Sequence, residues 1–262
     1  MNNDKVLELI SLENKVAIVT GGNSGIGLGT ANRLTEFGAS VAILGSNENK
    51  GAKAEEEIRE EGGTVMFVRC DVRNPKECED AVEIVVNEFG KIDILFNNAG
   101  VAIRKTVVDL EPDEWDLALD VSLKGQYLMS EFVIPYMRQA GGGSIINTGS
   151  GWSLRGGENA AAYCAMKGGS LNLTRAMCID HGKDNIRVNI VCPGDIDTPM
   201  LQSECEQLGS TYDQQFLDEC ADRPIARLGT VDDVANAVVF LASDMSSWVT
   251  GAHLVVDGGG IA

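Results

Sequence analysis

The sequence has few basic side chains and lacks any long apolar run. Its 262 residues carry 21 Lys and Arg against 39 Asp and Glu, a formal net charge of −18. This charge repels polyphosphate backbones and anionic headgroups at long range, so we expect neither a nucleic-acid partner nor a membrane partner. No stretch of about 18 apolar residues could span a bilayer, and residues 1–14 lack the apolar core of a leader peptide. We therefore expect a cytoplasmic protein.

The cysteines lack the number and spacing of a disulfide framework or a zinc site. There are seven, scattered along the chain, and no two form a C-x-x-C pair. We expect reduced thiols and no bound metal. Proline is also scarce, with six residues against 30 glycines, and the glycines follow no G-X-Y period. This composition indicates many tight loops between regular elements.

Short β-branched apolar runs alternate with segments of helical length. We expect strands at residues 16–20, 40–44, 65–69, 92–97, 144–148, 187–191 and 253–256. We expect helices at residues 25–37, 49–61, 74–89, 113–139, 160–180 and 231–243. This alternation predicts an α/β fold, namely one doubly wound Rossmann-type parallel sheet of about seven strands with helices on both faces. The whole chain, 1–262, is then a single domain.

One segment, residues 193–224, has no clear period and is too long for an ordinary connection. We interpret it as a lid over a substrate site. The alternative is a surface excursion with a short helix. Several of its side chains are apolar, and together with Trp152 they indicate an apolar pocket or the packing of the lid onto the body: Met200, Leu201, Tyr212 and Phe216.

A glycine-rich loop joins the first predicted strand to the first helix. Residues 20–27 read T-G-G-N-S-G-I-G. A strand–turn–helix of this kind lets the backbone approach a pyrophosphate and points helix N–H groups at it. The stretch resembles the T-G-x3-G-I-G motif of the short-chain dehydrogenase/reductase family, and the further matches span almost the whole chain.

The resemblance implies a set of cofactor contacts along the carboxyl ends of the strands. Residues 97–100 match the family's N-N-A-G, where Asn97 has either a structural role or a direct contact, and residues 193–198 match its P-G-x3-T segment. Asp71 matches the acid that binds the adenine amino group. The implied cofactor contacts are Gly21, Asn23, Ser24, Gly25, Ile26, Gly27, Ser46, Asn47, Asp71, Val72, Asn98, Ala99, Gly100, Tyr163, Lys167, Pro193, Gly194, Ile196 and Thr198.

The choice between NAD and NADP depends on the end of the second strand. An acid there grips the free ribose hydroxyls, and an arginine pairs with a 2′-phosphate. This chain has neither, because residues 45–47 read G-S-N. Both cofactors stay open; NADP is favoured, since no carboxylate repels its phosphate and Ser46, Asn47 and Lys50 can contact it.

The expected chemistry depends on Tyr163 and Lys167, which stand four residues apart on one face of a predicted helix. A phenol has an ordinary pKa of about 10, and adjacent cationic charge lowers it toward neutrality. Ser150 precedes Tyr163 by thirteen residues, a spacing seen in the family. The resemblance implies hydride transfer between NAD(P) and a secondary alcohol or ketone, with Tyr163 as general acid/base and Ser150 holding the substrate oxygen. A serine hydrolase is disfavoured, because His181 and His253 follow a helix and lie in a late strand, and no G-x-S-x-G surrounds Ser150.

Ser122 departs from the family pattern. Residues 120–125 read D-V-S-L-K-G, where the family commonly has asparagine in place of the serine. We expect Ser122 to belong to the catalytic set through either its side chain or its main chain. A serine that bonds to a preceding carbonyl can distort the helix there, as the family asparagine segment does. Some hydroxysteroid dehydrogenases of the family share this serine.

Several functional alternatives stay open at this stage. The expected substrate contacts are Ser150, Trp152, Tyr163 and Met200. Within the family, a hydroxysteroid dehydrogenase and a 3-oxoacyl reductase fit as well as an enzyme of medium-sized ketones and the corresponding secondary alcohols. A nucleotide-binding regulatory or scaffold protein is the alternative of another class, although it has no need of Ser150, Tyr163 and Lys167. The C-terminal residues 250–260 resemble the family tail that packs against another subunit, which implies a homotetramer.

Overall fold

The protein folds around one seven-stranded parallel sheet, as predicted. The computed structural model describes residues 3–262, so residues 1 and 2 of the predicted domain lie outside the described residues. In spatial order the strands are β3 (Thr64–Arg69), β2 (Ser40–Gly45), β1 (Val16–Thr20), β4 (Ile94–Asn97), β5 (Gly143–Thr148), β6 (Ile186–Pro193) and β7 (His253–Val256). All neighbouring pairs are parallel. The chain reverses its direction of winding between β1 and β4, the point at which doubly wound sheets bind ligands.

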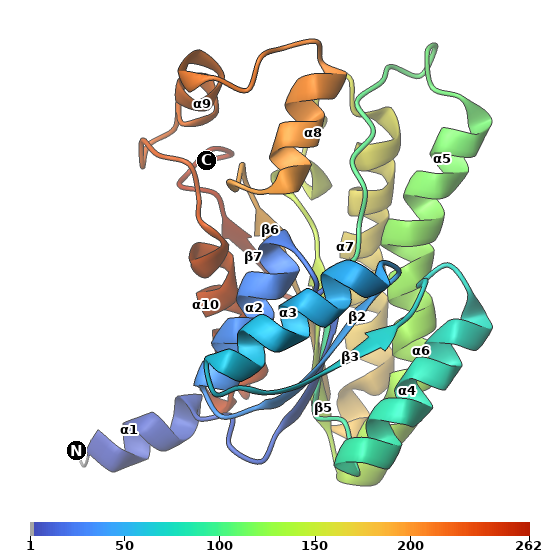
Figure 1. Cartoon of the computed structure of the whole chain (residues 1–262), viewed down its shortest axis with the longest axis vertical. Helices are drawn as coiled ribbons and strands as arrows, with labels where there is room; N and C mark the ends of the chain where they lie inside the picture. Colours follow the sequence, from blue (N-terminus) through green and yellow to red (C-terminus); the bar gives the residue numbers. More distant parts are fainter. Residues whose placement is uncertain (1–2) are drawn as a thin grey trace.

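Helices cover both faces of the sheet (Figure 1). One face carries α2 (Gly25–Glu36), α3 (Glu48–Glu60) and α10 (Val231–Ala242), and the other carries α4 (Pro75–Phe89), α6 (Gly125–Ala140) and α7 (Ala161–His181). Two separate apolar cores result, one on each side of the strands. Burial of each large apolar side chain contributes about 1.5–3 kcal/mol, which explains why the apolar strands need a helix layer on both faces.

Local signals in the sequence set the ends of these helices. The Asn47 side chain accepts a hydrogen bond from Lys50 N at the start of α3, and Asn74 does the same for Lys76 N at the start of α4. Gly90 ends α4 with a φ of 83°, a conformation that costs glycine little. The sequence analysis did not predict α1 (Asn3–Ile10), which precedes the first strand.

The single helix predicted for residues 113–139 is interrupted, and the structure corrects that prediction. α5 (Pro112–Leu119) leads into one π-helical turn, η1 (Asp120–Lys124), and then into α6. The helix distortion expected at Ser122 is therefore present. The Ser122 hydroxyl accepts a hydrogen bond from Val101 N at 3.2 Å, so its partner is another loop and not a preceding carbonyl of its own helix.

The segment expected as a lid contains two short helices, α8 (Pro199–Gln207) and α9 (Gln214–Cys220), and lies above the carboxyl ends of β6 and β7 (Figure 1). Thr198 and Pro199 begin α8, with the proline at the first turn, where its missing N–H is tolerated. Among the described residues, no helix is long and apolar enough to cross a membrane. All seven cysteines are free thiols, as predicted.

Candidate active site

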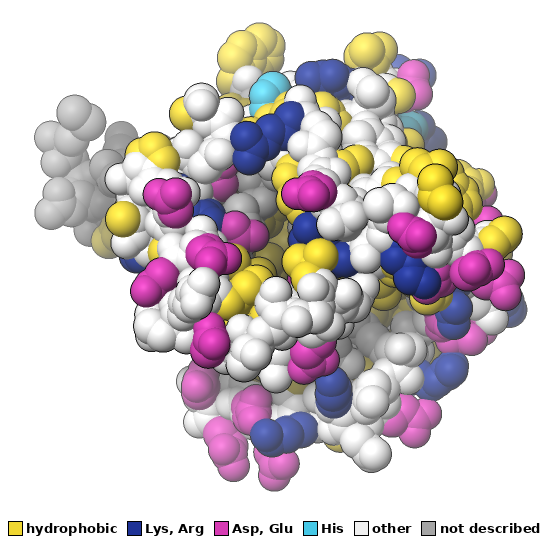
Figure 2. Space-filling model, turned by 90° about the horizontal axis from the view of Figure 1, so that it is seen from above, with side chains coloured by type: hydrophobic (Ala, Val, Ile, Leu, Met, Phe, Trp, Pro, Cys, Tyr) yellow, Lys and Arg dark blue, Asp and Glu magenta, His cyan; other side chains and the backbone are white. Residues whose placement is uncertain are grey.

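A groove runs along the carboxyl ends of the strands, on the face seen in Figure 2. It has a volume of about 470 Å³. Its walls come from the loops after β1, β2, β3 and β4 and from the start of α8. Of the predicted cofactor contacts it brings together Gly21, Asn23, Ser24, Gly25, Ile26, Ser46, Asn47, Asp71, Val72, Asn98, Ala99, Gly100 and Thr198.

The glycine loop forms the floor of this groove. Gly21 and Gly25 have positive φ values of 62° and 52°. A Cβ on Gly27 would lie 2.2 Å from the Gly21 carbonyl oxygen, so only glycine permits this close turn. Ser24 caps α2 without a side-chain hydrogen bond, and the first N–H groups of the helix stay available to a ligand. This arrangement fits the pyrophosphate of a dinucleotide.

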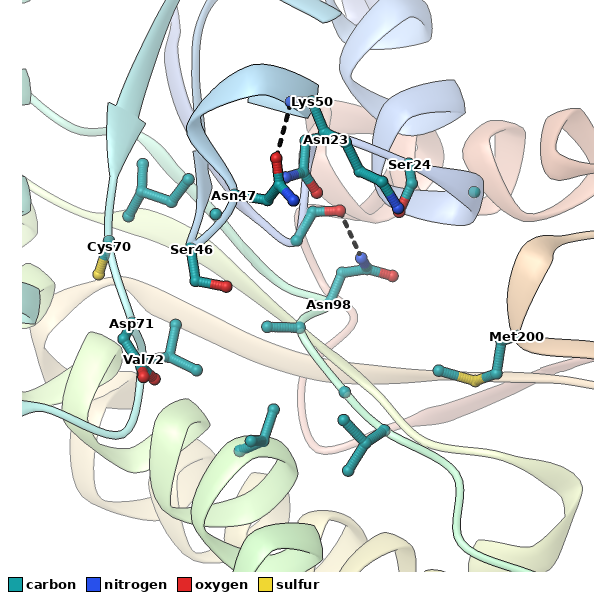
Figure 3. A pocket seen from close by; sticks show the side chains of 18 of the residues that line it. Asn23, Ser24, Ser46, Asn47, Lys50, Cys70, Asp71, Val72, Asn98 and Met200 are labelled. Atoms are coloured by element: carbon teal, nitrogen blue, oxygen red, sulfur yellow. Dashed lines mark hydrogen bonds between the residues drawn. The ribbon is translucent and has the colours of Figure 1, made fainter. Parts of the chain in front are cut away.

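The far end of the groove is polar and carries cationic side chains. Figure 3 shows Asp71 and Val72 across the groove from Asn23 and Ser24. The Asp71 carboxylate pairs with the Arg73 guanidinium, with Nη2 and Oδ2 2.6 Å apart, and hydrogen bonds from Arg73 lower the pKa of this carboxyl. Lys50 also lines the wall near Ser46. Asp71 is the only carboxylate in the lining of this groove among the described residues.

Two asparagines at the end of β4 hold the loops together. Asn97 is buried, and its amide donates to Asn147 Oδ1 at 2.9 Å. The Asn98 amide donates to the carbonyls of Thr20 and Gly21, the second of which is drawn in Figure 3. Asn97 therefore ties β4 to β5, and Asn98 fixes the glycine loop. Of the two roles left open for Asn97, the structural one is the one observed.

Tyr163 and Lys167 project from the first turns of α7 toward the end of β5. Lys167 is buried, its Nζ donates to the Thr148 carbonyl at 2.8 Å, and it lies 5.7 Å from the centroid of the Tyr163 ring. Burial lowers the pKa of Lys167 to about 8. Both side chains line a cavity of about 80 Å³ together with Pro193, Gly194, Ile196 and Thr198. This small cavity continues the cofactor groove, because Ile26, Asn98 and Met200 line both.

Ser150 follows β5 and begins the short helix η2 (Gly151–Ser153), where its Oγ accepts a hydrogen bond from Trp152 N at 3.2 Å. Burial raises the pKa of the Tyr163 phenol, the nearby Glu204 charge raises it further, and a hydrogen bond with Ser150 lowers it. Ser150 and Tyr163 share the wall of a third cavity, of about 240 Å³. Tyr163 is thus one of the side chains that line both the small cavity and this larger one.

Ser122 lies behind these groups. It is buried, and a Cβ built on Gly100 would lie 3.4 Å from its Oγ and 4.0 Å from Lys167 Nζ. Its hydroxyl does not line any of the three cavities. The side chain instead holds the Gly100–Val101 loop through the Val101 N–H.

The 240 Å³ cavity beside Ser150 and Tyr163 has a polar lining. It contains Trp152, but most of its other side chains are charged. Met200 lines the cofactor groove and the small cavity and is absent from this one. The rings of Tyr212 and Phe216 pack on each other with their centroids 5.7 Å apart, and neither residue lines this cavity. The charged side chains of the lining are Arg155, Asp195, Glu204, Glu219, Asp222, Arg223 and Asp257.

Helix α8 is bonded to the loop that follows β4. The Gln207 side chain accepts from Arg104 N at 2.9 Å and donates to the Ala102 carbonyl at 3.0 Å. The Arg104 guanidinium pairs with the Glu204 carboxylate, with Nη1 and Oε2 2.7 Å apart. These contacts close one side of the cavity beside Tyr163.

Sequence reasoning did not assign Arg73, Glu204 or Arg223 to the site. Arg73 stands two residues after Asp71, which was predicted as a cofactor contact, so the sequence did indicate this part of the site. Glu204 and Arg223 belong to the segment without a period, and nothing in the sequence places them near residue 163.

Comparison with known proteins agrees with this geometry. A family model described as Enoyl-(Acyl carrier protein) reductase matches residues 21–260. The chain is 36% identical over 249 residues to a 3-oxoacyl-(acyl-carrier-protein) reductase FabG of Chlamydia muridarum, a match that covers 95% of this chain and 98% of the relative. It is 38% identical over 248 residues to a cyclopentanol dehydrogenase of Comamonas sp., covering 95% and 97%.

Solved structures are also similar. A crystal structure of levodione reductase superposes with a TM-score of 0.90 at 31% identity and covers 94% of this chain and 97% of its own. Together with the fold, these relatives show an NAD(P)-dependent oxidoreductase that interconverts alcohols and ketones. With the family model and the relatives each covering more than nine-tenths of its length, this chain belongs to the short-chain dehydrogenase/reductase family.

Proposed function

We propose that the protein oxidises a small polar secondary alcohol, or reduces the corresponding ketone, with Tyr163 as general acid/base. The observation that carries this proposal is the position of Tyr163, which lies between the continuation of the cofactor groove and the 240 Å³ cavity, with Lys167 on one side and Ser150 on the other. The charged lining and modest volume of that cavity fit a small polar ligand better than an apolar steroid.

Each group has a definite part in the reduction. Nicotinamide, when bound, supplies the hydride that forms the new C–H bond. Ser150 donates a hydrogen bond to the carbonyl oxygen and orients it, and Tyr163 gives that oxygen its proton and becomes a phenolate. Lys167 keeps its positive charge at neutral pH, since its pKa is about 8, and stabilises this phenolate. The oxidation runs through the same positions in reverse.

NADP is the proposed cofactor. Asp71, the one carboxylate in the groove lining of the described chain, is paired with Arg73, and Lys50 adds a positive charge to the groove. A 2′-phosphate gains from nearby cations and would be repelled by an acid. We further propose a cytoplasmic homotetramer, consistent with the free thiols and with strongly exposed apolar side chains such as Ile179 and Trp248.

The test is a substrate panel with both cofactors, followed at the nicotinamide absorbance band. Small cyclic and acyclic secondary alcohols and their ketones are compared with hydroxysteroids and 3-oxoacyl thioesters. We expect the highest kcat/KM for a small alcohol or ketone with NADP. Tight cofactor binding without turnover of any compound would contradict the proposal and favour a regulatory protein. The mass in solution, measured by light scattering, tests the tetramer.

A further inference from the structure

We propose that Glu204 selects the substrate by accepting a hydrogen bond from a hydroxyl or ammonium group carried next to the reacting carbon. This inference rests on the proposed function, because Tyr163 marks where the reacting oxygen lies. It makes Glu204 a specificity-determining residue and names the substrate class as vicinal diols, amino alcohols and the corresponding ketones.

Glu204 is positioned to contact a substrate that binds at Tyr163. Glu204 lies on α8 and lines both the 80 Å³ cavity and the 240 Å³ cavity, and Tyr163 also lines both. The side chain of Glu204 is only 16% exposed. A substrate whose oxygen meets Tyr163 and Ser150 therefore places its neighbouring atoms beside this carboxylate.

The second argument is the state of the carboxylate. Arg104 pairs with Oε2, and its other donors go to the Glu158 carbonyl at 3.0 Å and the Asn159 carbonyl at 3.3 Å. The guanidinium also stacks 4.7 Å above the Trp152 ring. Each nitrogen of the Arg104 guanidinium thus makes a hydrogen bond, and Arg104 lines neither cavity. It holds Glu204 in place, and no donor among the described side chains reaches Oε1.

Glu204 Oε1 is not among the fully buried unpaired atoms of the described residues, so water in the cavities can reach it. A substrate that displaces this water leaves the oxygen unpaired, which is costly, unless the substrate supplies a donor of its own. A substrate of the same shape without the donor leaves the cost in place. Sites built in this way discriminate more strongly than apolar pockets, because the wrong ligand leaves a buried polar group unpaired.

The third argument is charge. In the larger cavity Arg223 pairs with Asp195 and Glu204 pairs with Arg104, while Glu219, Asp222 and Asp257 add negative charge against Arg155. Acidic side chains are spread around the hollowed face in Figure 2. Anionic substrates, including thioesters of phosphorylated carriers, are repelled at this wall, whereas hydroxyl and ammonium donors are attracted.

The test compares four alcohols of one ring size as substrates for oxidation: trans-1,2-cyclohexanediol, trans-2-aminocyclohexanol, trans-2-methoxycyclohexanol and cyclohexanol. The methyl ether keeps the second oxygen of the diol but cannot donate from it and is larger by one methyl group, whereas cyclohexanol lacks both the donor and the added bulk. We expect the wild-type enzyme to prefer the diol to the ether by about thirtyfold in kcat/KM, the range of a hydrogen bond to a charged group. Comparing the amine with the diol shows which donor Glu204 prefers.

The variant Glu204→Gln should reduce the diol-to-ether ratio to within about threefold, since the amide N–H₂ turns toward the substrate while the amide oxygen faces Arg104. The matched control is Glu206→Gln on the exposed face of the same helix, which should keep the wild-type ratio. Cofactor affinity and thermal unfolding check that each variant is folded. Glu204→Asp, which keeps the charge, is the second variant and should keep part of the preference.

Equal ratios in the wild-type enzyme and Glu204→Gln, with turnover in both, would overturn this inference and leave the proposed function intact. A wild-type enzyme that oxidises cyclohexanol and the ether as well as the diol would do the same. Failure of the wild-type enzyme to turn over any secondary alcohol or ketone would overturn the proposed function, and the inference with it.

Discussion

The two halves of the site differ in whether backbone or side chains form them. The cofactor half consists mainly of backbone: the tight Gly21–Gly27 turn, the open start of α2 and loops tied by Asn98. The proposed substrate half consists largely of charged side chains on α8 and the loops around it, held by contacts such as Arg104–Glu204 across 100 residues of sequence. A backbone-built half requires particular residue types at fixed spacing, whereas a half built from side chains can change its ligand by single substitutions.

The largest effect is expected at Tyr163, where the two halves of the site meet. Tyr163→Phe removes the transferable proton but little contact area, so we expect turnover to fall by about a thousandfold with cofactor affinity nearly unchanged. Steady-state kinetics and fluorescence titration with the cofactor measure the two effects separately. Activity like that of the wild-type enzyme would show that another group supplies the proton.

A second substitution, in the glycine loop, should weaken cofactor binding through the cofactor half alone. In Gly27→Ala the new methyl group would lie 2.2 Å from the Gly21 carbonyl oxygen and 2.6 Å from the Asn98 amide, so the loop must shift. We expect cofactor affinity to fall by more than about a hundredfold, since a shift of this size removes several backbone contacts. Titration with NADP is the measurement.

Gly182→Ala serves as the control, because a Cβ there meets nothing within 4 Å. It should bind cofactor as the wild-type protein does. Equal affinities in both variants would mean that the glycine loop does not hold the phosphates.

A negative charge placed in the cofactor half should change the preference between NADP and NAD without abolishing cofactor binding. Ser46→Asp puts a carboxylate where the 2′-phosphate is expected, and we predict that the ratio of kcat/KM for NADP over NAD falls by about thirtyfold. Ser46→Asn is the neutral control. Gly45 is a poorer position, because a Cβ there would lie 2.6 Å from the Asn23 amide and move that residue as well. An unchanged ratio in Ser46→Asp would place the ribose elsewhere.

The smallest effect on turnover is expected at Ser122, which lies behind the site. Ser122→Ala removes the acceptor of the Val101 N–H but leaves the π-helical turn its backbone, so we expect at most a tenfold loss of turnover, about 1.4 kcal/mol. Lys167→Ala should lose far more. If both variants lose activity equally, the Ser122 hydroxyl itself carries protons.

The sequence was informative where spacing reflects geometry. The seven strands and the glycine loop could be predicted, since parallel strands end at one edge and tight turns need glycine. The four-residue interval between Tyr163 and Lys167 likewise placed both on one helix face. The π-helical turn was expected only as a distortion at Ser122. Glu204 could not be predicted, because its position depends on how a segment without periodicity folds back over β6.

The Gln207 amide has a consequence for motion. By bonding to the main chain on both sides of residue 103, it attaches α8 to the loop after β4 much as one strand attaches to the next in a sheet. The two walls beside Tyr163 therefore move as one rigid body unless these bonds break. Moving α8 alone for the exchange of ligands must therefore break both hydrogen bonds of Gln207, and if the bonds persist the loop after β4 has to move together with the helix.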